Sequence, residues 1–220
     1  MTRQIMVGNV AIGGGAPVSI QSMLNTKTTD VEASLAQIRQ LASAGCQIAR
    51  LAVPNKAAAR GFAEICKESP LPLVADIHFD YTLAIAAAEG GAAKIRINPG
   101  NIGGEDRVKA VVDVCKDKNI PIRIGVNGGS LEKSLLEKYG HPTAEALVES
   151  ALWHLELLEK HGFYQSCVSM KSSTVPTMVA AARLFREKCD YPLHIGVTET
   201  GPVRQGLIKS AMGIGALLLD

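Results

Sequence analysis

The sequence predicts an α/β protein of the TIM (β/α)8-barrel type, truncated before its eighth strand and preceded by a short N-terminal β-hairpin. Its 220 residues, of which 47% are hydrophobic and only 4% aromatic, suit one medium-sized domain of closely packed strands and helices. Short β-branched runs alternate with longer helical segments along the chain. About seven such units follow one another, and a closed barrel needs eight, so we expect one strand to be missing.

Residues 1–16 are predicted to form a hairpin flap ahead of the barrel. Apolar residues alternate through 4–12 around Gly8-Asn9, which is a two-residue sequence typical of hairpin turns. The incomplete barrel is expected over 17–220, as the part that binds a substrate.

Each predicted strand is a short apolar, β-branched run followed by a helix. We expect strands at 18–23, 48–53, 73–78, 94–98, 122–127, 165–171 and 193–199. The capping box Thr29-Asp30-Val31-Glu32 predicts the start of the first helix, and Gly45 its end. Gly and Pro signals end the later helices, which are expected at 64–67, 81–89, 105–118, 175–188 and 207–219, with a helical insertion and a regular helix within 130–162.

Composition excludes several classes of function. The net charge of +2 provides no global field for nucleic acid. No apolar stretch approaches the ~18 residues of a membrane span, and the N-terminus has no export signal, so we expect neither insertion nor secretion. The five cysteines are odd in number, widely spaced and free of C-x-x-C pairs, which favours a reducing cytoplasm. The pair Asp76 and His78 lacks a third ligand, so no metal site is predicted.

Polar residues gather at the predicted carboxyl ends of the strands, where barrels of this type place their active sites. Because side chains alternate faces along a strand, residues two apart point into the same mouth. The predicted site comprises Arg50, Asp76, His78, Arg96, Asn98, Arg123, Asn127, Ser169, Lys171, Thr198 and Glu199.

The charge of this set indicates an anionic ligand. Three arginines and a lysine would leave uncompensated positive charge in a partly dehydrated cup, offset only by Asp76 and Glu199. Guanidinium forks bind phosphate through paired hydrogen bonds, so a diphosphate is the expected guest. The glycine-rich turns 98–104 and 125–130 could cradle phosphate, or could serve only as tight turns. Lys171 at a strand end could instead form a Schiff base.

Several blocks of sequence resemble the family of 4-hydroxy-3-methylbut-2-en-1-yl diphosphate synthases, iron-sulfur enzymes of the methylerythritol phosphate route to isoprenoids. The resemblance extends over essentially the whole chain. Its blocks are VGNVAIG at 7–13, IQSM at 20–23, TTDVEA at 28–33, LVADIHFDY at 73–81, IRINPGNIG at 95–103, IPIRIGVN at 120–127, GSLEK at 129–133 and HIGVTETG at 194–201.

This resemblance implies the reductive opening of 2-C-methyl-D-erythritol 2,4-cyclodiphosphate to the allylic diphosphate, with loss of a hydroxyl as water. It implies that Glu199 lies nearest the reacting carbon, and that Asp76, His78 and Thr198 orient the substrate or handle protons. Asn98 and Asn127 are implied as hydrogen-bonding partners, and Ser169 is included among the substrate-binding residues. The implied diphosphate clamp consists of Arg50, Arg96, Arg123 and Lys171.

The resemblance also implies a 4Fe-4S cluster on a separate C-terminal domain that this chain does not contain. None of the five cysteines matches a cluster-ligand motif. Flavodoxin or ferredoxin is the implied electron donor, and the complete enzyme is implied to be a homodimer. Two other functions stay open, namely a phosphate-binding transferase barrel resembling dihydropteroate synthase and a Schiff-base lyase that uses Lys171.

Overall fold

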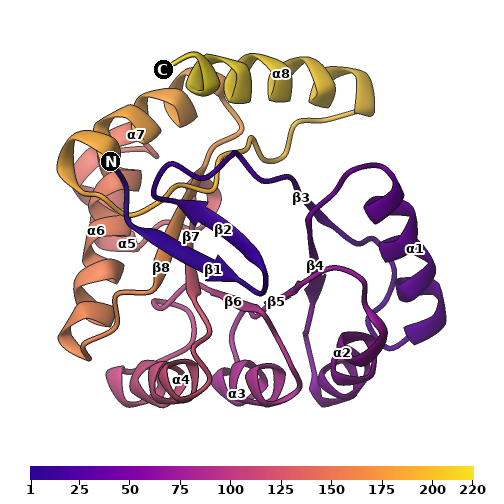
Figure 1. Cartoon of the computed structure of the whole chain (residues 1–220). Helices are drawn as coiled ribbons and strands as arrows, with labels where there is room; N and C mark the ends of the chain where they lie inside the picture. The colour runs from indigo at the N-terminus through magenta and orange to yellow at the C-terminus, as the bar shows by residue number, and fades with distance from the viewer.

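The structure, a computed structural model that describes all 220 residues, is an open barrel of six parallel strands surrounded by helices (Figure 1). The strands lie in chain order, and every crossover between neighbours contains at least one helix. They are β3 (Gln21–Met23), β4 (Ile48–Ala52), β5 (Leu73–Asp76), β6 (Lys94–Ile97), β7 (Ile122–Asn127) and β8 (Ser166–Lys171). The predicted fold class is therefore confirmed.

The helices form the outer layer of this barrel (Figure 1). They are α1 (Val31–Ser43), α2 (Lys56–Glu68), α3 (Tyr81–Glu89), α4 (Glu105–Asp117), α5 (Lys133–Tyr139), α6 (Ala144–Lys160), α7 (Val175–Lys188) and α8 (Val203–Leu219), with a short 3-10 turn at Gly128–Ser130. No helix is both long enough and apolar enough to cross a bilayer.

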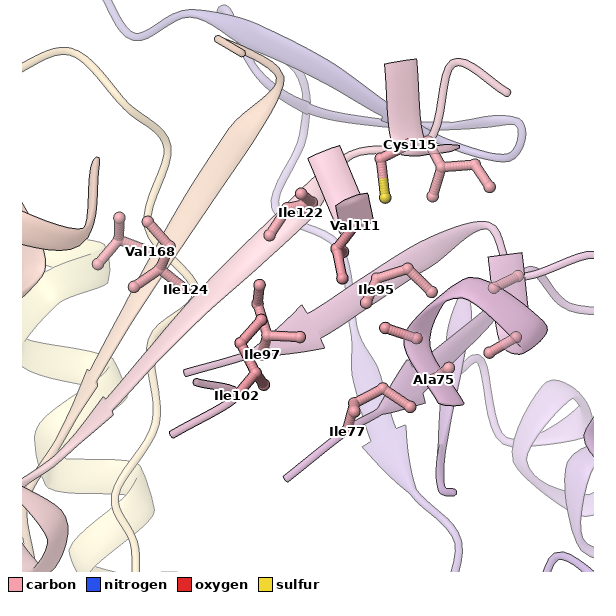
Figure 2. Packing of buried hydrophobic residues seen from close by; sticks show 14 of the residues in the cluster. Ala75, Ile77, Ile95, Ile97, Ile102, Val111, Cys115, Ile122, Ile124 and Val168 are labelled. Carbon is pink, nitrogen blue, oxygen red and sulfur yellow. The ribbon is translucent and has the colours of Figure 1, made fainter. Parts of the chain in front are cut away.

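The main hydrophobic core lies between the sheet and the helices, in one cluster of 43 buried residues. In β6 and β7 every second side chain belongs to it, and Figure 2 shows Ile95 and Ile122 beside Val111 of α4. Because side chains alternate along a strand, the residues between these isoleucines face the barrel interior. In β6 and β7 those inward residues include Arg96 and Arg123, so the interior is charged where most such barrels are apolar.

The predicted hairpin forms from β1 (Gln4–Val7) and β2 (Val10–Gly13), which pair antiparallel. Gly8 adopts φ 59°, a left-handed conformation that glycine reaches without steric cost. The hairpin crosses the centre of the ring in Figure 1, and Val7 packs against Ile48 and Val74 near the amino ends of their strands. It therefore closes the end of the barrel opposite the carboxyl ends of the strands.

The prediction of a seventh strand at 193–199 is wrong. Only Leu193 pairs with the sheet, through a single parallel bridge to Val168. The amide of His194 donates to the carbonyl of Val168 at 2.8 Å, and the chain then leaves the ladder before Glu199 turns into the left-handed region at φ 51°. The segment follows the sheet edge without joining it as a strand.

Several predicted boundaries also need correction. The N-cap of α1 is Asp30 and not Thr29, because the amide of Ala33 donates to Asp30 Oδ1 at 3.1 Å. The first barrel strand contains only 21–23, α2 begins well before 64, and α8 begins at Val203. These shifts do not alter which residues lie at the carboxyl ends of the strands.

Candidate functional site

Asp76 is the centre of an ion-pair network at the carboxyl ends of β4, β5 and β6. Its Oδ1 accepts a hydrogen bond from Arg96 Nη1 at 3.1 Å. Its Oδ2 lies 3.6 Å from Arg50 Nη2 and 3.3 Å from His78 Nε2. Strand register explains the pairing, since Asp76 lies opposite Arg96 and Arg96 lies opposite Arg123 in the parallel ladder.

This network holds Asp76 in its ionised form. Burial by itself would raise the pKa of the carboxyl, but the charges of Arg50, Arg96, His78 and Arg123 outweigh burial and hold that pKa below its ordinary value. Asp76 is therefore a fixed negative charge that orients the surrounding cations.

One carboxylate does not balance the cations around it. Arg123 is 1% exposed, and its Nε and Nη1 have no hydrogen-bond partner. Burial, followed by repulsion from Arg50, lowers the pKa of Arg123 to about 9. At the end of β8, burial and then the charges of Arg123, Arg50 and Arg96 lower the pKa of Lys171 to about 8. Unpaired buried cations are costly, so the site favours an anion that supplies the missing acceptors.

Two further basic residues face the same interior, and the sequence analysis missed both. Lys94 is fully buried, its Nζ has no partner, and burial lowers its pKa to about 8. Burial, and then the positive charges led by Arg123 and Lys171, hold the pKa of His194 well below its ordinary value. The sequence contained a signal for both residues. Lys94 is two residues before Arg96, and His194 is four residues before Thr198; in an extended chain, residues separated by an even number of positions lie on the same face.

Gly125 makes room for the guanidinium of Arg96. A Cβ at this position would lie 2.3 Å from Arg96 Nε, while Arg96 Nη2 donates to the Gly125 carbonyl at 3.4 Å. With its amide oriented so that the oxygen faces Arg96, Asn127 accepts a second bond from that Nη2 at 3.2 Å. Arg96 is thus held from both β5 and β7.

Two predicted site residues have partners within the fold. Asn98 Oδ1 accepts from the amide of Gly100 at 3.1 Å, so that the side chain closes the turn after β6. Ser169 is buried and its hydroxyl donates to the carbonyl of Ile124 at 3.3 Å, linking β8 to β7. Both residues lie at the mouth, and both help to hold its shape.

Thr198 and Glu199 reach the mouth from the irregular segment after α7. The amide of Thr198 donates to the carbonyl of Ser172 at 3.2 Å, which fixes this segment to the end of β8. Glu199 is exposed, and its Oε1 lies 3.9 Å from the position that a Cβ on Gly129 would take. Its φ of 51° is strained for a side chain of this type, and such strain is concentrated at functional sites.

A large cavity adjoins this interior. It has a volume of about 1030 Å³ and lies between the hairpin, the 192–197 segment and α8. Lys94, Lys171 and His194 are among the residues that line it. The unpaired amine of Lys94 and the side chain of Lys171 therefore face a space that a small molecule can enter.

The residues of this chain do not fit an iron-sulfur cluster. All five cysteines are free thiols, and no three His, Cys, Asp or Glu side chains gather as a metal site. Burial raises the pKa of Cys66 and that of Cys115 to about 12, which keeps both thiols protonated. A cluster needs a cage of thiolates, and these cysteines do not form one.

The amino-acid sequence is similar to a known protein family and to named proteins of several bacteria. Residues 2–220 match the family described as GcpE TIM-barrel domain. The chain is 58% identical over 219 residues to "4-hydroxy-3-methylbut-2-en-1-yl diphosphate synthase (flavodoxin)" of Idiomarina loihiensis, and 58% identical to the protein of the same name from Geobacter sulfurreducens. All of this chain is covered in both comparisons, but it spans only 59% and 62% of the lengths of these relatives.

Solved structures support the fold alone. A Thermotoga maritima phospho-2-dehydro-3-deoxyheptonate aldolase matches 97% of this chain and 62% of its own, with a TM-score of 0.67 and 14% identity. A 7,8-dihydropteroate synthase from Vibrio fischeri matches 87% of this chain and 76% of its own, with a TM-score of 0.61 and 13% identity.

Proposed function

Because the chain belongs to the GcpE TIM-barrel domain family, we propose that it is the substrate-binding barrel of a reductase in isoprenoid biosynthesis. The proposed reaction converts 2-C-methyl-D-erythritol 2,4-cyclodiphosphate to (E)-4-hydroxy-3-methylbut-2-enyl diphosphate. The names of the relatives support the product, and the cluster of cations with unpaired nitrogen atoms in the barrel interior supports a diphosphate guest. That cluster is the observation on which the proposal depends.

The residues of the mouth suggest a division of roles. Arg50, Arg96, Arg123 and Lys171 clamp the diphosphate, since each adds positive charge that Asp76 alone does not neutralise. Asp76 and His78 orient the arginines and the substrate, while Asn98, Asn127, Ser169 and Thr198 provide hydrogen bonds around it. Glu199 faces the open mouth as the carboxylate nearest the reacting carbon.

Electrons enter from outside this barrel in our proposal. The relatives carry flavodoxin in their names, which supports flavodoxin as donor, with ferredoxin as the alternative. A 4Fe-4S cluster supplies the electron transfer in the complete enzyme, and its ligands are not among the residues of this chain. We further propose that the complete enzyme is a homodimer and that it works in the cytoplasm, where free thiols persist.

Calorimetry with the cyclodiphosphate tests the proposal directly. Arg96→Ala removes charge-assisted hydrogen bonds worth about 1.5 to 3 kcal/mol, so the affinity should fall about 10-fold to 150-fold. Lys109→Ala removes a cation that pairs only with Asp113 on the exposed face of α4, and its affinity should match the unaltered chain. No measurable binding by the unaltered chain, or equal affinities for both variants, would contradict the proposal.

One observation favours a second candidate, a Schiff-base lyase. A lysine whose pKa is lowered to about 8 by burial is a better nucleophile at neutral pH than an ordinary lysine, and Lys171 has this property. Borohydride reduction in the presence of a ketone substrate would trap such an adduct on Lys171. We expect no adduct, because the neighbouring arginines suit an anionic ligand better than a carbonyl.

A further inference from the structure

A partly buried glutamate and a fully buried histidine lie outside the network of Asp76, between two loops of the mouth. Glu132 N-caps α5, five residues after Asn127 of β7, and His154 belongs to α6. Glu132 Oε1 lies 2.8 Å from His154 Nε2 and also accepts a bond from the hydroxyl of Ser150 at 3.1 Å. The pair therefore joins the loop after β7 to the helix that covers β7 and β8.

The charge state of this pair follows from its contacts. Burial by itself would raise the pKa of Glu132, but hydrogen bonds from His154 and Ser150 outweigh it and hold that pKa below its ordinary value. An ionised carboxylate only accepts hydrogen bonds, so His154 Nε2 carries the proton and donates it. His154 is fully buried, and its Nδ1 and the Oε2 of Glu132 have no partner.

A largely buried ion pair with two unpaired atoms contributes little net stability, because the cost of its desolvation offsets its attraction. Its position suggests a different contribution. A Cβ on Gly100 would lie 3.1 Å from His154 Cε1 and 3.5 Å from Glu132 Oε1, so the pair is packed directly against the loop after β6. Gly100 is also the residue whose amide donates to Asn98 Oδ1.

The pair thus contacts both glycine-rich loops of the mouth. On one side it packs against Gly100, which fixes Asn98. On the other side Glu132 terminates the loop that begins at Asn127 and contains the 3-10 turn Gly128–Ser130. A glycine-rich loop has little stiffness of its own, so its position depends on such outside contacts.

We infer that Glu132 and His154 are positioning residues, which hold the two loops at the separation that lets Asn98 and Asn127 meet the substrate together. This inference rests on the proposed function, since the ligand is the cyclodiphosphate. Neither residue touches the reacting atoms, and both act through the loops.

Three variants of the chain test the inference. His154→Phe keeps the ring volume and removes the hydrogen bond to Glu132, whereas His154→Gln keeps a donor at the same distance along the side chain. Tyr191→Phe is the matched control. The hydroxyl of Tyr191 donates to Glu159 at 2.6 Å, so this variant also removes a hydrogen bond to a side chain of α6. Glu159 lies at the end of α6 towards the amino ends of the strands, away from the mouth. Urea unfolding measures stability, calorimetry measures cyclodiphosphate affinity, and NMR follows the side-chain amides of Asn98 and Asn127.

We expect His154→Phe to lower the affinity about tenfold and to shift both amide signals, with His154→Gln recovering most of the loss. Tyr191→Phe should lose stability without either effect. The inference is overturned if His154→Phe binds as the unaltered chain does, or if Tyr191→Phe weakens binding equally. Failure of the unaltered chain to bind the cyclodiphosphate would instead count against the proposed function, while unshifted amides in His154→Phe would separately overturn the positioning role.

Discussion

At the scale of single residues, the site is governed by an imbalance between one buried carboxylate and several cations. Asp76 accepts from Arg96 and lies near Arg50, but Arg123 and Lys94 keep unpaired nitrogen atoms in the interior. Placing like charges together costs free energy in the empty site, and a bound anion recovers it. Ligand binding is therefore expected to respond strongly to the protonation of these cations.

The lowered pKa of Lys171 predicts that affinity depends on pH. Lys171 loses its proton as the pH rises through about 8, whereas an ordinary lysine stays charged to about 10. The ionisation of the cyclodiphosphate does not change over this range, so its affinity should fall between pH 7 and pH 9. Lys171→Arg keeps its charge and should flatten the slope in calorimetry at successive pH values. Identical slopes would show that Lys171 does not contact the anion.

The same shift has an opposite consequence for stability. Between the folded pKa near 8 and the higher unfolded value, the unfolded chain binds more protons, so the contribution of Lys171 to stability rises with pH across that window. Below that window the charged amine destabilises the fold. Stability and ligand affinity therefore respond to the proton on Lys171 in opposite directions.

Glu199 is the second residue at which function and stability oppose each other. Its left-handed backbone costs about 1 to 2 kcal/mol in the folded state. Glycine would remove this cost, but it would also give the unfolded chain more conformational entropy, which cancels part of the gain in stability. Glu199→Gly should therefore raise the free energy of unfolding by about 0.5 to 1 kcal/mol in urea. Asn119→Gly, at φ 54°, should gain less because asparagine tolerates this region better. Equal or reversed changes would show that the backbone at Glu199 is not strained.

At the scale of elements, two of the three glycines of α8, Gly213 and Gly215, have different packing environments. Gly213 is the one buried residue of α8, and a Cβ there would lie 2.6 Å from Met178 Cε and 3.0 Å from Val197 Cγ2. A Cβ at Gly215 would meet nothing within 4 Å. Gly213 allows α8 to approach α7 and the 193–199 segment, whereas Gly215 only lowers helix propensity.

This contrast predicts opposite effects from one substitution. Gly215→Ala should stabilise the chain by about 1 kcal/mol through helix propensity. Gly213→Ala gains the same propensity, but overpacking against Met178 and Val197 costs about 1 to 3 kcal/mol, so the net change should be a destabilisation of up to about 2 kcal/mol. Urea unfolding of the two variants side by side makes the comparison, and a change of the same sign in both would contradict the packing described for α8.

At the scale of the whole molecule, the barrel encloses a charged interior, and its cysteines do not gather into a set of metal ligands. The hairpin closes one end, the loops after the strands surround the other, and the cysteines are scattered through the fold. In our proposal this chain contributes the binding and orientation of an anion.

We accordingly predict that this chain assembles no 4Fe-4S cluster. Anaerobic treatment with iron and sulfide should give neither the absorption nor the EPR spectrum of a stoichiometric cluster, because Cys66 and Cys115 stay protonated and no thiolate cage exists. The treated chain should reduce no cyclodiphosphate with a chemical reductant, although it should still bind it. A stoichiometric cluster together with turnover would refute this prediction.

Local patterns in the sequence determined the architecture and the main charges of the mouth. Parallel strands end at one edge and their side chains alternate, so Asp76, Arg96 and Arg123 could be placed together from spacing alone. The hairpin was equally predictable, because the turn at Gly8-Asn9 needs only adjacent residues.

Only the tertiary structure decided which of these groups lack partners and what supports them. Lys94 and Arg123 are unpaired because no acceptor from another element reaches them, and Glu132 meets His154 across 22 positions of sequence. The segment 193–199 has strand-like residues but pairs with the sheet only at Leu193. Burial, pairing and strain depend on the distances between elements far apart in the chain, and periodicity within one element contains no information about them.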